Sequence, residues 1–404
     1  MIEQLAYLND PLKLDFEAVI IQKTPVAGGG LEVILEQTYF YPTGGGQERD
    51  TGTLGQARVI DVFKNEAGQV VHRLDRDVSE GQIPATIDRE RRLGHMQRHS
   101  AQHLLSRSFE DALGLETLAV KISADSPTTL DLPGVEISQV DLERVERLAN
   151  AVILENRPIK SYVINDDQIT SIPFRRPPKV TGTIRVVEIE AFDYSACGGT
   201  HCLQTGMIGL LKIIKTESKN QKLRVHFVVG QQALRYFQQY QTIVTDISHQ
   251  FSTAPSEIVL LSQQQAEQLQ TAQKTIHQLK AALLPVEAER LIAQAEAVDG
   301  YRLVLALLND KSTVELRQLA ALLRANKGTI AVLAGVEGHK LSLVVGCADD
   351  TGISARELLK QQLAVIGGRG GGNDQVAQGG GTVTAAQVVN FFEQTKVFIN
   401  AGTE

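Results

Sequence analysis

Short runs rich in Val and Ile alternate with polar residues over the first eighty-odd positions of the chain. Apolar residues at every second position, bounded by turn residues, are typical of half-buried β-strands. We therefore expect a small sheet or barrel, with Gly28-Gly29-Gly30 as the turn between its first two strands. The expected strands cover residues 18–24, 31–38, 57–63 and 69–74.

The pattern changes to helical spacing near Arg89. Apolar residues three and four apart predict one helix over residues 91–113 and a second over 139–155. Ser138 stands where the second helix needs an N-cap, with Asp141 three residues further on. Strands are expected to return over residues 184–189, 208–214 and 224–229, which makes this part α+β.

Residues 255–297 are rich in Gln, Ala, Glu and Leu and repeat apolar side chains in alternating steps of three and four. This is the spacing of a coiled-coil seam, which Pro285 interrupts. Only two heptads are covered, so a helical hairpin within one chain and a dimer seam both remain open. We interpret the segment as a connecting arm. The seam positions are Leu269, Ala272, Ile276, Leu279 and Leu283.

The last hundred residues alternate strand and helix patterns, which predicts a compact α/β unit with helices packed on a small sheet. The chain shows no repeat of fixed period. Strands are expected over 302–308, 329–334 and 341–347, and helices over 313–326, 354–363 and 384–396. The expected fold class is α+β in four parts: a β subdomain (1–88), an α+β domain (89–245), a helical arm (246–299) and the α/β unit (300–404).

The 404-residue chain is 43% hydrophobic and 22% charged, which is typical of a soluble globular protein. It shows no apolar run of membrane-spanning length and no export signal, and its three cysteines are too few for a disulfide framework. A cytoplasmic location, without a membrane partner, is the simplest expectation.

The net charge of −7 argues against indiscriminate binding to nucleic acid, but it allows a local basic face. One such cluster lies between 206 and 240, contains Lys212 and Lys215, and is opposed in sequence only by Glu217. A second cluster consists of Arg175, Arg176, Lys179 and Arg185. For each cluster, a solvent-exposed strand edge without a partner is an equally good explanation.

The strongest chemical signal is a pair of short motifs. His99 and His103 are four apart on a predicted helix, so both side chains can reach one ion. Cys197-Gly-Gly-Thr-His201 adds a thiolate and an imidazole around a tight turn. Three histidines and one cysteine form a standard tetrahedral Zn²⁺ set. His95 continues the ladder of four-residue steps, so spacing alone also allows a His95/His99 pair.

A glycine-rich motif lies upstream, with Phe40-Tyr-Pro-Thr43-Gly-Gly-Gly-Gln47 followed by Asp50-Thr-Gly. Three glycines let backbone N–H groups line a concavity, and Thr43 and Gln47 place hydrogen-bonding side chains at its rim. In isolation such a motif is more often a hairpin connection. Beside a metal motif, a substrate pocket becomes the better interpretation.

These motifs together resemble the editing domain shared by alanyl- and threonyl-tRNA synthetases, with its H-x-x-x-H and C-x-x-x-H motifs. The Cys197-Gly-Gly-Thr-His201 run is closest to the alanyl branch. The resemblance implies zinc held by His99, His103 and Cys197, with His201 as a further ligand, and it leaves His95 as a structural residue. A zinc protease is disfavoured because position 100 is Ser where H-E-x-x-H requires Glu.

A second glycine tract covers residues 367–381, contains Arg369 and Gly370, and precedes the last predicted helix. In isolation it would be a mobile loop, but its backbone amides and guanidinium also suit phosphate contacts. The tract resembles the DHHA1 domain of alanyl-tRNA synthetases. The order of modules, without aminoacylation domains before them, resembles the long class of free-standing alanyl-tRNA editing proteins, AlaX.

That resemblance implies a hydrolase that removes a wrong amino acid from tRNA(Ala), with serine as the expected substrate and glycine as a further candidate. Thr43 is expected to read the serine hydroxyl, with Gln47 assisting, and the zinc residues His99, His103 and Cys197 to support catalysis. A homodimer could form through the arm or the last unit. Two alternatives stay open: a deacylase for another aminoacyl-tRNA, and a non-catalytic zinc-containing protein that binds tRNA or dimerises.

Overall fold

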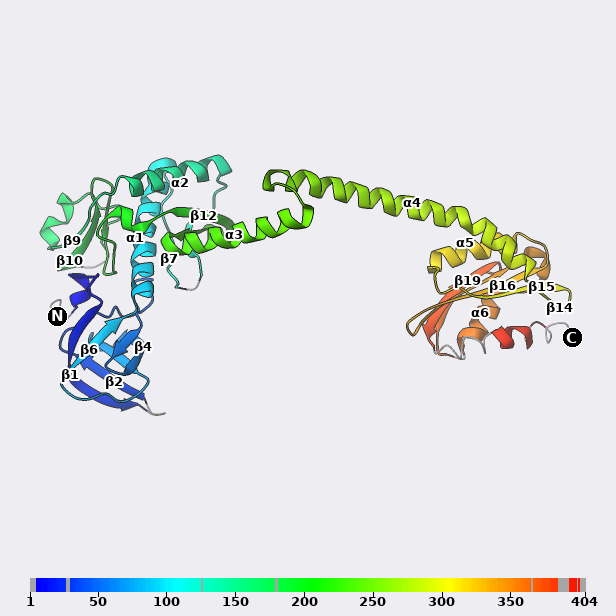
Figure 1. Ribbon diagram of the computed structural model, residues 1–404, viewed down its shortest axis with the longest axis horizontal. Helices are drawn as coiled ribbons and strands as arrows, with labels where there is room; N and C mark the ends of the chain where they lie inside the picture. The colour runs from blue at the N-terminus through cyan, green and yellow to red at the C-terminus, as the bar shows by residue number, and fades with distance from the viewer. Residues whose placement is uncertain are drawn as a thin grey trace. The chain divides into compact units, whose positions relative to one another are not determined.

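The computed structural model describes residues 5–26, 30–124, 126–178, 181–364, 366–383, 392–397 and 399. The chain divides into two compact units, Met1–Gln250 and Phe251–Glu404 (Figure 1). Both contain helices and strands, which confirms the expected α+β class. Of the helices in the described part of the chain, none combines the length and apolar character needed to cross a bilayer.

A closed antiparallel barrel begins the first unit, in the strand order β1-β2-β5-β4-β3-β6. Val33, Leu54, Val62 and Leu74 fill its interior. All four strands expected from the alternating pattern are present, and the Gly28-Gly29 turn lies outside the described residues. The strands are β1 (Asp15–Val26), β2 (Gly30–Leu35), β3 (Gly52–Leu54), β4 (Ala57–Lys64), β5 (Val70–Leu74) and β6 (Gln82–Ile87).

Two of these strands, β3 and β6, were not expected, yet they close the barrel. β3 is only three residues long, too short for a periodic signal. β6 contains Pro84, which cannot donate a ladder hydrogen bond and so weakens a strand prediction.

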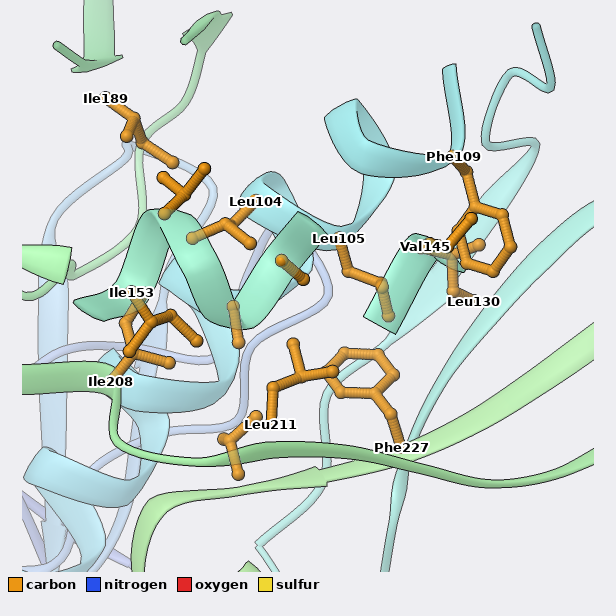
Figure 2. Close-up of a cluster of buried hydrophobic side chains, with 14 of the residues drawn as sticks. Leu104, Leu105, Phe109, Leu130, Val145, Ile153, Ile189, Ile208, Leu211 and Phe227 are labelled. Carbon is orange, nitrogen blue, oxygen red and sulfur yellow. The ribbon is translucent and has the colours of Figure 1, made fainter. Parts of the chain in front are cut away.

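Two helices, α1 (Arg89–Leu113) and α2 (Gln139–Leu154), follow the barrel as predicted. Asp88 caps α1 by accepting a hydrogen bond from the Arg91 N–H. Ser138 caps α2 through the Asp141 N–H, which confirms the predicted N-cap. The apolar faces of the two helices pack together with neighbouring strands in the core that Figure 2 shows around Leu104, Leu105 and Phe109.

Two further antiparallel sheets complete the first unit, in the orders β11-β10-β9 and β12-β13-β8-β7. β10 matches its expected range, whereas β12 starts three residues late because Ile208 ends a 3-10 turn. Helix α3 (Gly230–Phe251) ends the unit. The strands are β7 (Ala119–Lys121), β8 (Thr128–Pro133), β9 (Ile159–Ile164), β10 (Ile184–Ile189), β11 (Asp193–Ala196), β12 (Leu211–Lys219) and β13 (Lys222–Val229).

The second unit is built on a six-stranded sheet in the order β14-β15-β16-β17-β19-β18. β15 and β16 are parallel and joined through α5, while the other neighbours are antiparallel. Most of the helix expected over 384–396 lies outside the described residues. The elements are β14 (Glu296–Val298), β15 (Tyr301–Leu307), α5 (Thr313–Arg324), β16 (Thr329–Glu337), β17 (Lys340–Cys347) and α6 (Ala355–Ala364).

The arm is one helix, α4 (Ile258–Ala293), which runs through Pro285. The expected interruption at this proline was therefore wrong. Proline removes one helical hydrogen bond, but Leu284, Ala288 and Leu291 are buried in the core that α5 shares, and this packing holds the turns around it. The seam residues Leu269, Ile276, Leu279 and Leu283 are 55–63% exposed.

The second glycine tract is a β-hairpin at one edge of the sheet, not the loop that we expected. It forms β18 (Arg369–Gly372) and β19 (Val376–Thr382). A Cβ added at Gly379 would lie 2.3 Å from Cδ1 of Leu363 in α6, so glycine is what lets this helix lie directly on the strands. Glycine disfavours strands by propensity, and the pattern of the sequence therefore misses them.

Candidate metal and substrate site

Four side chains from two distant segments meet inside the first unit. α1 carries His99 and His103, and the chain after β11 carries Cys197 and His201, with all four ligand atoms within 4.8 Å of one another. The Cys197 Sγ lies 3.3 Å from the Nε2 atoms of both His99 and His201. Ligand atoms around a tetrahedral zinc ion are separated by about 3.4–3.6 Å, so the two Sγ–Nε2 distances are close to that spacing, and the donor set of three imidazoles and one thiol is one that Zn²⁺ prefers.

Each imidazole of the group is held by an outer partner on its Nδ1 atom. His99 Nδ1 lies 2.8 Å from Gln47 Oε1, and His103 Nδ1 lies 3.3 Å from Asp193 Oδ2. The third contact joins His201 Nδ1 and the Ser100 hydroxyl at 3.2 Å. Such contacts fix the ring orientation of metal-binding histidines and leave Nε2 for the ion.

Burial sets the protonation of these groups. It lowers the pKa of His99 to about 3 and that of His201 well below its usual range. Burial also lowers the pKa of His103, but hydrogen bonds to Asp193 and Cys197 outweigh it and the net shift is upward. Burial raises the pKa of the Cys197 thiol, but the hydrogen bond and charge of His103, the Gly199 N–H and the charge of Arg185 together outweigh it and the pKa falls. Neutral imidazoles and a thiolate are the forms that bind metal.

The turn between the two later ligands requires glycine. A Cβ at Gly199 would lie 2.1 Å from Cε1 of His99, so any side chain would displace that ring. The Arg185 guanidinium fixes the same turn by donating to the carbonyl oxygens of Cys197 at 2.9 Å and Gly199 at 3.0 Å. Gly199 thus allows the close approach of the His99 ring.

The glycine-rich motif contacts the four candidate ligands His99, His103, Cys197 and His201, here called the metal group, through Gln47. This buried amide accepts from the Thr200 N–H as well as contacting His99, and its Nε2 donates to the Thr200 hydroxyl at 2.9 Å. Gln47 therefore orders the candidate ligand set, and the substrate contact that we expected of it stays a prediction. Thr43 is exposed, and its N–H donates to the Val62 carbonyl at 3.1 Å.

A buried ion pair fixes this motif to the ligand helix. Arg92 of α1 is fully buried and donates to both oxygens of Asp50, which also accepts from the Tyr41 N–H. Another guanidinium nitrogen of Arg92 donates to the Pro11 carbonyl at 2.6 Å. Nothing in the local pattern distinguishes Arg92 from its exposed neighbours, so the sequence analysis missed it.

His95 does not join the metal group. Its side chain is fully buried, and its two ring nitrogens have no hydrogen-bond partner among the described residues. Burial lowers its pKa to about 3. The structure therefore favours the His99/His103 pair over the His95/His99 pair.

The expected basic faces are largely paired with acids. Lys212 forms an ion pair with Glu146 at 2.7 Å, and Lys215 pairs with Glu217. Glu146 is distant in sequence, so the fold adds to the first cluster an acid that the local sequence does not contain. Such exposed pairs are weak, and the lysines remain available to a stronger partner.

The second basic cluster is not a solvent face either. Arg175 is half-buried and donates to Asp193 at 2.8 Å, behind His103, and the Arg185 guanidinium donates to the loop that carries Cys197. Arg176 pairs with Glu116 at 3.2 Å, and Lys179 lies outside the described residues. Asp193 is a site residue that the sequence analysis missed, since a lone acid in a short strand carries no motif.

In the second unit, Arg369 and Gly370 line a surface cleft of about 550 Å³ together with Lys340 and Ser342. Both glycine-tract residues are exposed on the edge strand β18. The cleft is therefore lined by the guanidinium of Arg369, the ammonium group of Lys340 and the glycine backbone of the hairpin.

Two family models match the chain. The "Threonyl and Alanyl tRNA synthetase second additional domain" matches residues 184–224, which include Cys197 and His201 but not the two histidines of α1. The "DHHA1 domain" matches residues 300–400.

Alanine–tRNA ligases are similar over almost the whole chain. That of Methanosarcina acetivorans is 30% identical over 397 residues, covering 93% of this chain and 42% of the ligase. That of Archaeoglobus fulgidus is 32% identical over 391 residues, covering 92% and 41%. The chain thus spans about two fifths of the length of these relatives.

One solved structure, the C-Ala domain of Aquifex aeolicus alanyl-tRNA synthetase, is 27% identical, covers 26% of this chain and 97% of that one, and has a TM-score of 0.25. The sequence relationships alone confirm the resemblance inferred from the motifs. The chain is a homologue of the alanine–tRNA ligases that carries the second additional domain of threonyl- and alanyl-tRNA synthetases together with a DHHA1 domain.

Proposed function

We propose that this protein is an aminoacyl-tRNA deacylase that removes serine from mischarged tRNA(Ala), using Zn²⁺ held by His99, His103, Cys197 and His201. The observation that carries the proposal is the buried group of three imidazoles and one thiolate in which every Nδ1 atom has an outer partner. Surface histidines that met by chance would not share this arrangement. Because the similar proteins are alanine–tRNA ligases, we take tRNA(Ala) as the carrier.

The chain's own residues hold and orient the reacting groups. Zinc, when bound, would polarise the ester carbonyl or lower the pKa of a water molecule. With His201 as a fourth ligand the site is closed and suits positioning, whereas three ligands would leave an open place for substrate or water. Gln47 keeps His99 in register through its amide in either case.

Selectivity for serine follows from hydrogen bonding. A synthetase pocket made for alanine cannot strongly reject an analogue that adds one hydroxyl. A second site that hydrogen-bonds this hydroxyl selects serine, because alanine would leave its polar groups unpaired. We assign this contact to Thr43, on the exposed rim of the glycine-rich motif, with Gln47 behind it.

The tRNA backbone is assigned to basic and glycine-rich surfaces at Lys212, Lys215, Arg369 and Gly370. In this proposal, residues 1–245 carry out the hydrolysis. The arm and the DHHA1 domain bind tRNA or form a homodimer. Exposed apolar positions along α4, such as Ile276 and Leu279, support a partner for the arm.

The deciding experiment measures release of labelled serine, glycine and alanine from tRNA(Ala), with and without a chelator. We expect rapid serine release, slow or no alanine release, and loss of activity on metal removal that Zn²⁺ restores. Equal release of all three, or none from any, contradicts the proposed selectivity. Folded, metal-free protein with unchanged hydrolysis contradicts the role of zinc.

A further inference from the structure

One guanidinium beside the metal group has no acidic partner. Arg185 is half-buried, and no carboxylate among the described residues forms an ion pair or a hydrogen bond with it. The two other guanidinium groups that hold parts of the site, those of Arg92 and Arg175, are each paired with a buried aspartate. A partly buried charge that lacks a counterion is unfavourable, so the fold alone does not account for Arg185.

The hydrogen bonds of Arg185 leave one edge of its guanidinium group without a firm partner. Nη1 donates to the carbonyl oxygens of Cys197 at 2.9 Å and Gly199 at 3.0 Å, which uses both of its protons. Nη2 donates to the Leu8 carbonyl at 3.4 Å, longer than a usual N–H···O bond. Among the described residues, no group accepts a hydrogen bond from the Nε–H. The Nε edge, which suits the two oxygens of a carboxylate or phosphate, is thus left for a ligand.

The charge of Arg185 acts on both parts of the candidate site. The Cys197 N–H donates to the Arg185 carbonyl at 3.1 Å, so the two residues are neighbours across adjacent strands and their side chains leave the sheet on the same face. Burial lowers the pKa of His99, and the charge of Arg185 lowers it further. Burial raises the pKa of Tyr41 in the glycine-rich motif, and the same charge opposes that increase. A ligand that Arg185 holds therefore lies close to the metal group and to the glycine-rich motif.

The charge balance favours an anionic ligand at this place. A Zn²⁺ ion bound to one thiolate and to neutral imidazoles keeps a net positive charge. The ion and the guanidinium repel each other unless an anion lies near both. An aminoacyl ester on a terminal ribose carries no negative charge itself. The nearest one is the phosphodiester on the 5′ side of the terminal nucleoside, and phosphate is a group that the free edge of an arginine binds well.

We propose that Arg185 binds the phosphate group that joins the terminal nucleoside of the tRNA to the rest of the 3′ strand. The Nε edge holds the phosphate oxygens, while Nη1 stays on the loop of residues 197–201 that carries two of the metal ligands. One side chain then fixes the position of the terminal nucleoside relative to the metal group. The choice of ligand rests on the proposed function, because that function brings a terminal phosphodiester to this loop.

The test compares two analogues that bind to the zinc-loaded full chain, with calorimetry as the measurement. Both are 3′-deoxy-3′-serylaminoadenosine, in which an amide replaces the ester and prevents hydrolysis. One of them also carries a 5′-methyl phosphate, which has the single charge of a backbone phosphodiester. We expect the phosphorylated analogue to bind about tenfold more tightly, the size of one charge-assisted contact, and this ratio to decrease as the salt concentration rises.

Arg185→Gln should bring the two dissociation constants to within about twofold of each other, because the charged contact is lost. Arg185→Lys keeps the charge without the planar edge and should retain part of the preference. A loosened loop would weaken both analogues alike and leave their ratio unchanged. The ratio therefore separates phosphate binding from a merely structural role of Arg185, and the zinc content of each variant reports on the loop itself.

Arg157→Gln is the matched control in the same unit. Arg157 also donates to two loop carbonyl oxygens, those of Glu190 at 3.2 Å and Ala191 at 3.0 Å, but it is paired with Glu155. Its removal should leave the ratio at the wild-type value. A ratio near one in the wild type, an unchanged ratio in Arg185→Gln, an equal decrease in Arg157→Gln, or no binding of either analogue would overturn the proposal.

Hydrolysis is measured in parallel and separates this proposal from the proposed function. If seryl-tRNA(Ala) is cleaved while the preference for the phosphorylated analogue does not depend on Arg185, the phosphate assignment fails and the deacylase function stands. If seryl-tRNA(Ala) is not cleaved but the preference is present and depends on Arg185, the phosphate assignment stands and the proposed function fails.

Discussion

At the scale of single residues, the geometry of the four candidate metal ligands depends on side chains outside that set. Gln47 and Asp193 orient two of the imidazoles, and Arg175 neutralises Asp193 behind His103. A buried acid without a partner would be costly, so the pair keeps a charged hydrogen-bond acceptor where the ligand needs it.

His103→Ala should abolish full zinc content, because it removes one of four donors. His95→Leu should keep the zinc content and fold at least as stably as wild type, since it replaces a buried ring with unpaired nitrogens by an apolar side chain of similar size. Metal analysis of the purified variants checks both. Zinc retained in His103→Ala and lost in His95→Leu would show that the ligand pair is assigned wrongly.

Thr43→Val should lower serine removal by about 1–3 kcal/mol in transition-state free energy, because it keeps the shape and removes the hydroxyl. The measurement is kcat/KM on seryl-tRNA(Ala), with zinc content as the control, which should not change. Equal losses on seryl and glycyl substrates would mean that Thr43 does not read the hydroxyl.

His72 should make the barrel sensitive to acid. Burial lowers its pKa to about 4, with Thr38 Oγ1 at 2.8 Å from its Nε2. Between pH 6.5 and about 4 the imidazole of His72 binds a proton in the unfolded chain but not in the folded chain. The free energy of unfolding therefore decreases as the pH is lowered through this range, by up to roughly 3 kcal/mol. His72→Gln should flatten that part of the profile. Parallel unfolding profiles for both proteins would contradict the assignment.

At the scale of elements, glycine is required at two positions, Gly199 and Gly379, because a neighbouring side chain packs directly against the backbone there. The turn at Gly199 lets the His99 ring approach the ligand loop, and the Gly379 strand lets α6 lie on the edge hairpin. The same residue type that suggests a flexible loop in a sequence here permits tight packing.

Gly379→Ala should therefore destabilise the second unit by about 1–3 kcal/mol, the usual cost of overpacking a filled space. Gly371→Ala is the matched control on the same hairpin, because nothing lies within 4 Å of its added Cβ. Denaturant unfolding of the full chain compares the two. Equal stability of both variants would show that α6 can shift away at little cost.

At the scale of the whole molecule, the division into two compact units suggests that the first unit carries the hydrolytic site and the second contributes to RNA binding. A chain ended at Gln250, the boundary of the first unit, should fold and retain zinc while binding tRNA more weakly and with a flatter salt dependence. In the full chain, Arg369→Ala should raise the KM for tRNA modestly with little change in kcat. If both proteins bind and cleave like wild type, the second unit serves dimerisation instead.

The sequence by itself determined the local structure and the donor types. Periodicity predicted α1, α2 and four barrel strands, because burial of one face leaves its period in the chain. The spacing of His99 and His103, and the Cys197–His201 run, predicted a metal group, because residues four apart share a helical face and two glycines make a turn.

Only the tertiary structure decided which distant groups pair. Glu146 opposes Lys212, Asp193 supports His103, and Gln47 supports His99, although 52 to 90 residues separate the members of the two histidine pairs. Tertiary packing also allows α4 to continue through Pro285. In the same way, the glycine tract forms two strands although glycine disfavours strands by propensity. Propensity and periodicity act within one element, whereas pairing, burial and steric approach depend on the neighbours that folding brings together.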